Sequence, residues 1–191
     1  MRRRVLAGCA GILIVVGTFD VALAAISATA TITGEQQLPS GKYEYTVSLT
    51  NSGSTSLSTF WFGWIAYLNS IPYDLMPSQP GSVVSPAGWF GSAQHDGIGQ
   101  YGIEWYTNTA LAPGQTANGF VFDTADSPAV INGTSFFAGY PVRESWVYQN
   151  VYAGTSNSGA GAELAPTIAP APEPGIALVF PILLLLTGRR H

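Results

Sequence analysis

Cysteine is nearly absent from this sequence, because Cys9 is the single cysteine among 191 residues. It lies in an apolar N-terminal segment, so the chain beyond it can form no internal disulfide and offers no thiol nucleophile or thiolate ligand. Cysteine-dependent catalysis and cysteine-ligated metal sites are thereby excluded. A domain formed by the rest of the chain must be stable through packing alone.

Positive charge is scarce as well. Between residues 25 and 172 the only bases are Lys42 and Arg143, against nine acids, which gives this region a net charge of about −7. Nucleic acids and anionic lipids are poor partners for such an acidic surface. We therefore expect neither as a partner.

Sustained helical periodicity is the third absence. Between residues 25 and 153 no apolar period of 3.6 residues persists for three turns, whereas residues 26–33 and 43–50 alternate apolar and polar side chains. Such alternation is typical of half-buried strands. We expect further strands at residues 60–68, 99–107, 119–123, 135–138 and 145–152. Short strands between glycine- and proline-rich turns predict an all-β fold, a single β-sandwich over residues 25–153.

Two short motifs refine this fold class. Leu111-Ala112-Pro113-Gly114-Gln115 precedes the strand-like Gly119-Phe120-Val121-Phe122, and Thr50-Asn51-Ser52-Gly53-Ser54 ends an alternating segment. Pro-Gly and Asn-Ser-Gly are turn sequences. Both motifs resemble turns and strand ends of immunoglobulin-like domains in exported bacterial proteins. The resemblance implies an immunoglobulin-like β-sandwich.

The N-terminus has the three parts of a signal peptide. Arg2-Arg3-Arg4 is followed by an apolar segment at residues 5–16, and Ala22 and Ala24 supply the small residues that a signal peptidase reads. We expect residues 1–24 to be removed. The alternative is lipid attachment at Cys9. A lipobox normally follows the apolar segment of a signal peptide, however, and here most of that segment comes after Cys9.

The C-terminus carries a second apolar segment. Residues 175–187 would form a helix of about 20 Å, short of the roughly 30 Å hydrocarbon core of a bilayer, and Pro181 interrupts them. Arg189 and Arg190, in the basic tail 188–191, favour the cytoplasmic side. The segment is therefore suited to a transient stop in the inner membrane, although an ordinary short tail anchor is the alternative.

Pro172, Glu173 and Pro174 stand directly before this segment. Together, residues 172–191 closely resemble the PEP-CTERM sorting signal of exported proteins from exopolysaccharide-producing Gram-negative bacteria. The resemblance implies cleavage at the triplet by an exosortase, a membrane-embedded cysteine enzyme, and delivery to the cell surface or extracellular matrix. Residues 154–171, rich in Gly, Ser, Ala and Pro, are expected to be a linker that holds the cleavage site away from the domain.

Candidate catalytic and metal-binding residues are few. His95 follows a glycine-rich stretch and has no nucleophile motif near it, so we expect a solvated loop histidine. Asp123 and Asp126 are too few to coordinate Ca²⁺ alone. Glu44 and Glu104 would suit a glycosidase only at a set separation, and solvent-facing strand positions explain both. We expect no catalytic residue, no cofactor and no metal.

Aromatic residues are the unusual surplus. Strand alternation places Trp146, Tyr148 and Tyr152 on one face and Val147 and Val151 on the other. If the valines face the core, the aromatic stripe is exposed and could stack on sugar rings. We favour the alternative, in which the aromatic stripe is itself the core face, because aromatic side chains bury large areas. The sequence therefore predicts a non-enzymatic cell-surface or matrix protein, with exopolysaccharide binding as the alternative.

Overall fold

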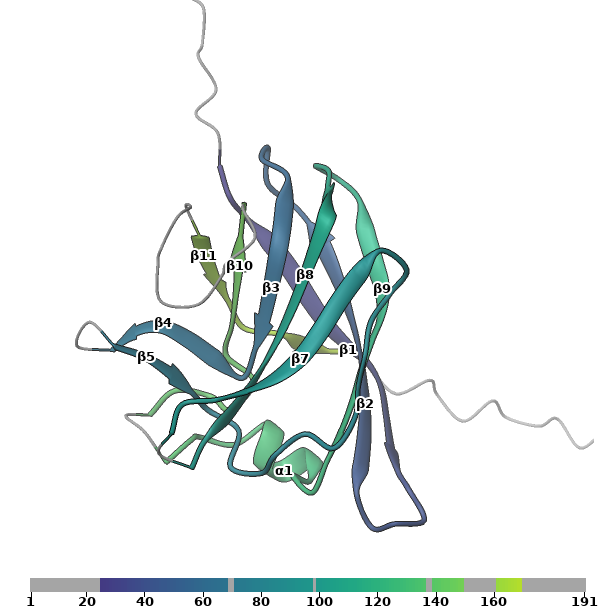
Figure 1. Ribbon diagram of the computed structural model, residues 1–191, viewed down its shortest axis with the longest axis vertical. Coiled ribbons are helices and arrows are strands. Elements are labelled where there is room, and N and C mark those ends of the chain that lie inside the picture. The colour runs from purple at the N-terminus through teal and green to yellow at the C-terminus, as the bar shows by residue number, and fades with distance from the viewer. Residues whose placement is uncertain (1–24, 69–70, 98, 137–138, 150–160, 170–191) are drawn as a thin grey trace, which may run out of the picture.

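The computed structural model describes residues 25–68, 71–97, 99–136, 139–149 and 161–169, which form a β-sandwich of two five-stranded sheets (Figure 1). The first sheet has the strand order β12 (Thr167–Ile168), β1 (Ala28–Gln37), β2 (Tyr43–Asn51), β9 (Thr116–Thr124) and β6 (Val83–Val84). The second has the order β11 (Gly161–Leu164), β10 (Ser145–Tyr148), β3 (Leu57–Phe62), β8 (Tyr101–Leu111) and β7 (Trp89–His95). The expected all-β sandwich is confirmed.

Three smaller elements complete the described residues. A hairpin of β4 (Trp64–Leu68) and β5 (Ile71–Asp74) forms a separate two-stranded sheet, and α1 (Pro128–Ile131) is a single helical turn. Strand pairing is antiparallel except between β1 and β12. In the described residues no helix is long and apolar enough to span a membrane.

The core between the sheets follows the alternation seen in the sequence. In β2, Tyr45, Val47 and Leu49 are completely buried, and the residues between them are only partly buried. From the second sheet Trp105 stacks on Phe60, with 5.5 Å between ring centroids. Aromatic side chains bury large areas, so this core compensates for the lack of disulfides.

The apolar segment at residues 60–68, expected as one strand, forms two. Gly63 adopts a positive φ of 65°, at which the chain leaves the second sheet and enters β4. A Cβ at this position would lie 2.6 Å from the Met76 Cγ atom. Glycine is therefore required here both for the backbone conformation and for the close approach of Met76.

Several other segments differ from expectation. The glycine-rich stretch before His95 is strand β7 rather than a loop, and Ser135 and Phe136 do not belong to a strand. Inside the expected linker, β11 pairs with β10 and β12 pairs with β1. The sandwich therefore continues to Ile168, beyond the boundary expected at residue 153.

The predicted processing elements lie outside the described residues. They are the signal peptide with Ala22 and Ala24, the Pro172-Glu173-Pro174 triplet, the apolar segment 175–187 and the basic residues Arg189 and Arg190.

Candidate functional site

The outer face of the second sheet, which carries the outward side chains of β11, β10, β3, β8 and β7, concentrates the aromatic residues outside the core. Val147 packs in the core, so Trp146 and Tyr148 point outward, and the prediction that the aromatic stripe is the core face is wrong. Strand pairing arranges this face in two cross-strand rows. The first row is Glu163, Trp146, Trp61, Glu104 and Ser92; the second is Gly161, Tyr148, Thr59, Tyr106 and Phe90.

Part of this face is an aromatic cluster formed by Trp61, Trp64, Trp146 and Tyr148. Trp61 and Trp64 stack with 4.6 Å between centroids, and Trp64 from β4 meets both Trp146 and Tyr148 edge-on. Tyr148 is only 3% exposed, whereas Trp146 is partly buried. These two predicted sugar contacts thus face outward but are packed against the cluster; the third, Tyr152, lies outside the described residues.

Gly161 helps to bury Tyr148. A Cβ on Gly161 would lie 2.5 Å from Cε1 of the tyrosine ring. The ring therefore lies directly over the backbone of β11, a contact that only a residue without a side chain allows.

The second aromatic feature of this face is the pair of Phe90 on β7 and Tyr106 on β8. Their rings stack with 5.4 Å between centroids and an interplanar angle of 28°. Phe90 is 52% exposed although its neighbour Trp89 points into the core. Sequence reasoning missed this pair because residues 88–97 were expected to be a loop, and strand alternation around Trp89 is the signal that would have revealed it.

Glu104 lies between these two aromatic groups. It points outward, as expected, but it is only 8% exposed, and its Oε1 atom has no hydrogen-bond partner among the described residues. Burial raises the pKa of this carboxyl to about 7. Glu44 lies on the other sheet, in β2, and faces outward there, so the two glutamates are not brought together as a glycosidase pair.

Two further buried carboxyls flank the second sheet. Burial, with a smaller contribution from Asp96, raises the pKa of Asp74 to about 7. Burial also raises the pKa of Glu144 to about 7, reinforced by the charge of Glu163 and by a hydrogen bond between the two carboxyl groups. Each of these acids is therefore partly protonated near neutral pH.

The remaining polar candidates are separated. His95 is exposed at the end of β7, where its ring contacts Tyr101 and its Nδ1 accepts a 3.2 Å hydrogen bond from the Gly97 N–H. Asp123 binds Lys42 with 3.0 Å between Oδ1 and Nζ, while Asp126 accepts a hydrogen bond from the Ser78 N–H. No group of three or more potential metal ligands occurs in the part of the chain that the structure describes.

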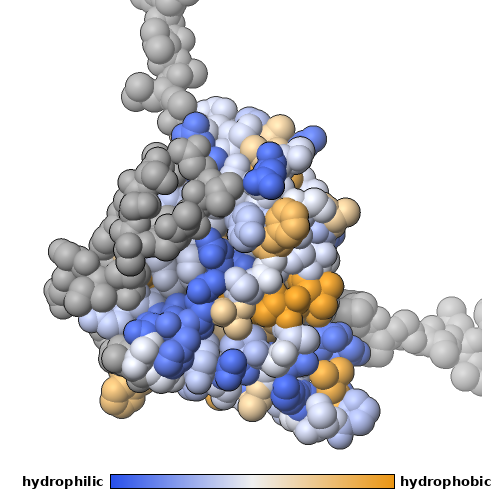
Figure 2. Space-filling model, in the orientation of Figure 1, coloured by the Kyte–Doolittle hydropathy of each residue, from blue (hydrophilic) through white to orange (hydrophobic). Residues whose placement is uncertain are grey.

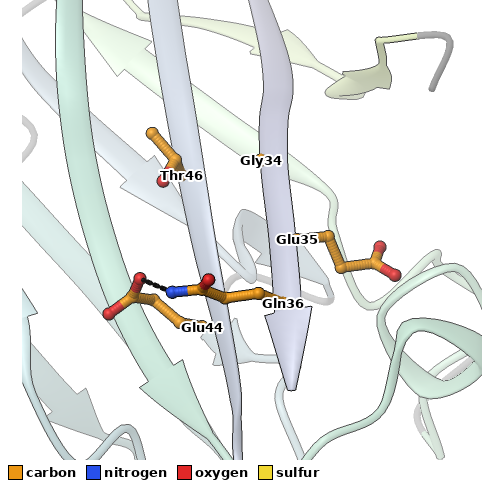
Figure 3. A pocket seen from close by; sticks show the side chains of 5 residues that line it. All are labelled: Gly34, Glu35, Gln36, Glu44 and Thr46. Carbon is orange, nitrogen blue, oxygen red and sulfur yellow. Dashed lines mark hydrogen bonds between the residues drawn. The ribbon is translucent and has the colours of Figure 1, made fainter. Parts of the chain in front are cut away.

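A shallow polar depression lies on the outer face of the first sheet, beside the bulge in β1 (Figure 3). Its volume is about 300 Å³, and Gly34, Glu35, Gln36, Glu44 and Thr46 line it. Gln36 donates a 2.7 Å hydrogen bond to Glu44, and the Glu35 carboxylate points away from this pair. The depression offers no aromatic surface and no convergent set of polar groups.

Comparison with known proteins assigns no family to this chain. No family model matches the sequence, and no curated protein is detectably similar to it. Among solved structures, a GH20 exo-β-N-acetylglucosaminidase from Vibrio harveyi, in complex with N-acetylglucosamine, matches with a TM-score of 0.38 and 12% sequence identity. A structure of an inactive mutant of that enzyme gives the same values. The match covers 75% of this chain but only 18% of the enzyme.

Proposed function

We propose that this chain is an exported, non-enzymatic protein of the cell surface or extracellular matrix, delivered by a PEP-CTERM sorting signal. The order of features at the C-terminus carries the proposal: Pro172-Glu173-Pro174, then a short apolar segment, then Arg189 and Arg190. The signal-peptide pattern at residues 1–24 supports it, because both ends of the precursor would then be held at the cytoplasmic side.

The short distance between the end of the sandwich and the triplet limits how the protease could reach its cleavage site. Strand β12 ends at Ile168, four residues before Pro172, and four residues span at most about 14 Å. Before cleavage the folded domain would therefore be held close to the membrane surface. A membrane-embedded protease would have to reach the triplet beside the domain rather than along a long linker.

Substitution of Glu173 tests this proposal. Glu173→Ala should leave export and folding intact while the unprocessed chain accumulates in the membrane fraction of the native host. Glu35→Ala, which removes an exposed acid of the domain, is the matched control and should be processed like the parent. Release of Glu173→Ala without its tail, at the parental rate, would contradict the proposal.

A second candidate function, recognition of a surface glycan, is supported by the orientation of β10. Because Val147 faces the core, Trp146 and Tyr148 of β10 lie on the outer face of the second sheet. Flat aromatic rings with uncharged polar neighbours suit the stacking and hydrogen bonding that sugars require. Retention of the chain by a polysaccharide would support this function, and the location of the contact follows from the geometry below.

A further inference from the structure

We propose that Phe90 and Tyr106 form the stacking platform of a binding site for a neutral polysaccharide, with Ser92 and Gln94 as its polar contacts. This inference rests on the second candidate function. It assigns the contact to the β7 edge of the second sheet instead of to Trp146, Tyr148 and Tyr152.

The platform consists of two stacked rings at the margin of the sheet. Because β7 is the edge strand of the sheet, no further strand among the described residues pairs with β7 on the side away from Tyr106. Figure 2 shows apolar patches amid polar surface on the side of the molecule that carries β7. A half-exposed phenylalanine ring gains by covering its surface with the apolar C–H side of a sugar ring.

Uncharged polar groups stand beside the rings. Ser92 and Gln94 follow Phe90 at alternate positions of β7 and therefore share its face. The Gln94 Nε2 atom donates a 2.8 Å hydrogen bond to the Ser92 Oγ atom. This bond orients the amide while its carbonyl oxygen and the serine hydroxyl remain available to sugar hydroxyls.

Glu104 borders the platform without being one of its contacts. It occupies the neighbouring cross-strand row, paired with Ser92 and two residues from Tyr106 on the same strand face. Its side chain is more than nine-tenths buried, and Oε1 has no hydrogen-bond partner among the described residues. This oxygen is itself fully enclosed, so a sugar bound on the outer surface would not reach it.

The negative charge of the domain favours a neutral polysaccharide over an acidic one. The region between residues 25 and 172 carries nine acids and two bases, and Glu104 itself lies beside the platform. An acidic polymer such as alginate would be repelled by this surface. A neutral polysaccharide is compatible with both the rings and the amide and hydroxyl groups.

Affinity electrophoresis of the exported chain tests the site. Native gels would contain hydroxyethylcellulose, galactomannan, dextran or alginate. We expect at least one neutral polymer to retard the parent, and Phe90→Ala and Tyr106→Ala each to weaken that binding about fivefold or more, as loss of one stacking contact does for nucleobases. Phe90→Tyr should retain binding. Ile168→Ala, which removes an exposed apolar side chain from the first sheet, is the matched control and should bind like the parent.

Three results would overturn the inference. The first is a parent that no neutral polymer retards, and the second is retardation by alginate alone. The third is binding that survives Phe90→Ala and Tyr106→Ala but is lost in Trp146→Ala, which would preserve glycan recognition and place it elsewhere. Thermal melting of each variant verifies that it is folded. The processing of Glu173→Ala is measured separately, so failure of the sorting proposal and failure of this site are distinguishable.

Discussion

Replacement of Glu104 by glutamine should stabilise the protein at pH 8 and change its stability by less than about 1 kcal/mol at pH 5. Burial raises the pKa of this carboxyl from 4.5 to about 7, so at pH 8 the folded state holds a buried carboxylate that the unfolded state exposes to water. At 1.36 kcal/mol per pKa unit, this difference corresponds to about 3 kcal/mol. Glutamine has nearly the same shape without the charge.

The sign of the effect follows from proton linkage. Between pH 4.5 and about 7 the folded state binds more protons at Glu104 than the unfolded state does, so the stability of the parent falls as pH rises through this window. Asp74 and Glu144, whose pKa values burial also raises to about 7, act in the same direction. Stability should therefore rise on mild acidification from pH 8 to pH 5.

Urea unfolding followed by tryptophan fluorescence at the two pH values measures this prediction. The Glu104→Gln variant should gain up to about 3 kcal/mol at pH 8, or roughly 10 °C in melting temperature, and its stability should vary less with pH than that of the parent. Glu35→Gln, at an exposed position, should behave like the parent. Equal destabilisation of Glu104→Gln at both pH values, or a parent that is more stable at pH 8, would refute the reasoning.

Two further predictions concern the framework. Gly63→Ala should lower the free energy of unfolding by about 2–4 kcal/mol, because it combines a positive φ with a contact to Met76; Gly41→Ala, with positive φ but nothing within 4 Å, should cost about 1 kcal/mol. Equal urea midpoints for the Gly63→Ala and Gly41→Ala variants would contradict this prediction. Lys42→Ala should cost less than about 1 kcal/mol, because the ammonium is half exposed. Burial of Asp123 opposes ionisation, but hydrogen bonds from Lys42 and Ser82 lower its pKa overall. The stabilisation from the Lys42–Asp123 ion pair should therefore disappear as pH falls below about 4. A Lys42→Ala variant that loses more unfolding free energy near pH 3 than at pH 7 would contradict this prediction.

Strands with one buried and one solvated face could be predicted from the sequence. In β2 the buried side chains Tyr45, Val47 and Leu49 alternate with polar residues, and this period is visible without any knowledge of the partner strands. The same local signal identified β1, β8, β9 and β10. Their neighbours in the sheets could not be predicted because pairing depends on contacts distant in sequence.

The elements that were missed look locally like loops or linkers. Strand β7 contains Gly91, which it needs because a Cβ there would lie 2.4 Å from Cδ1 of Trp105. Strand β11 contains Gly161 and lies in a segment rich in glycine and alanine, yet it pairs with β10. In both strands glycine permits a close aromatic contact, and composition alone cannot distinguish this from flexibility.

The candidate site could be predicted only in part from the sequence, because its geometry also depends on contacts between strands distant in sequence. Alternation separated Val147 from Trp146 and Tyr148 but did not show which side faces the core, and the interpretation that we favoured, with the aromatics in the core, was wrong. It placed Glu104 on an outer face, but the burial of Glu104 depends on neighbours from other strands. The stacking of Phe90 on Tyr106 joins residues of two strands and became visible only once the pairing of β7 with β8 was known.

The most direct test of the proposed export and sorting is the intact mass of the chain recovered from the cell surface or medium of its native host. Removal of a signal peptide at Ala24 and cleavage at the Pro172-Glu173-Pro174 triplet predict a product that begins at Ala25 and ends at or beside this triplet. Any attached glycan would appear as a series of added masses on that product. A recovered chain that still begins at Met1, or that still ends at His191, would contradict the proposal.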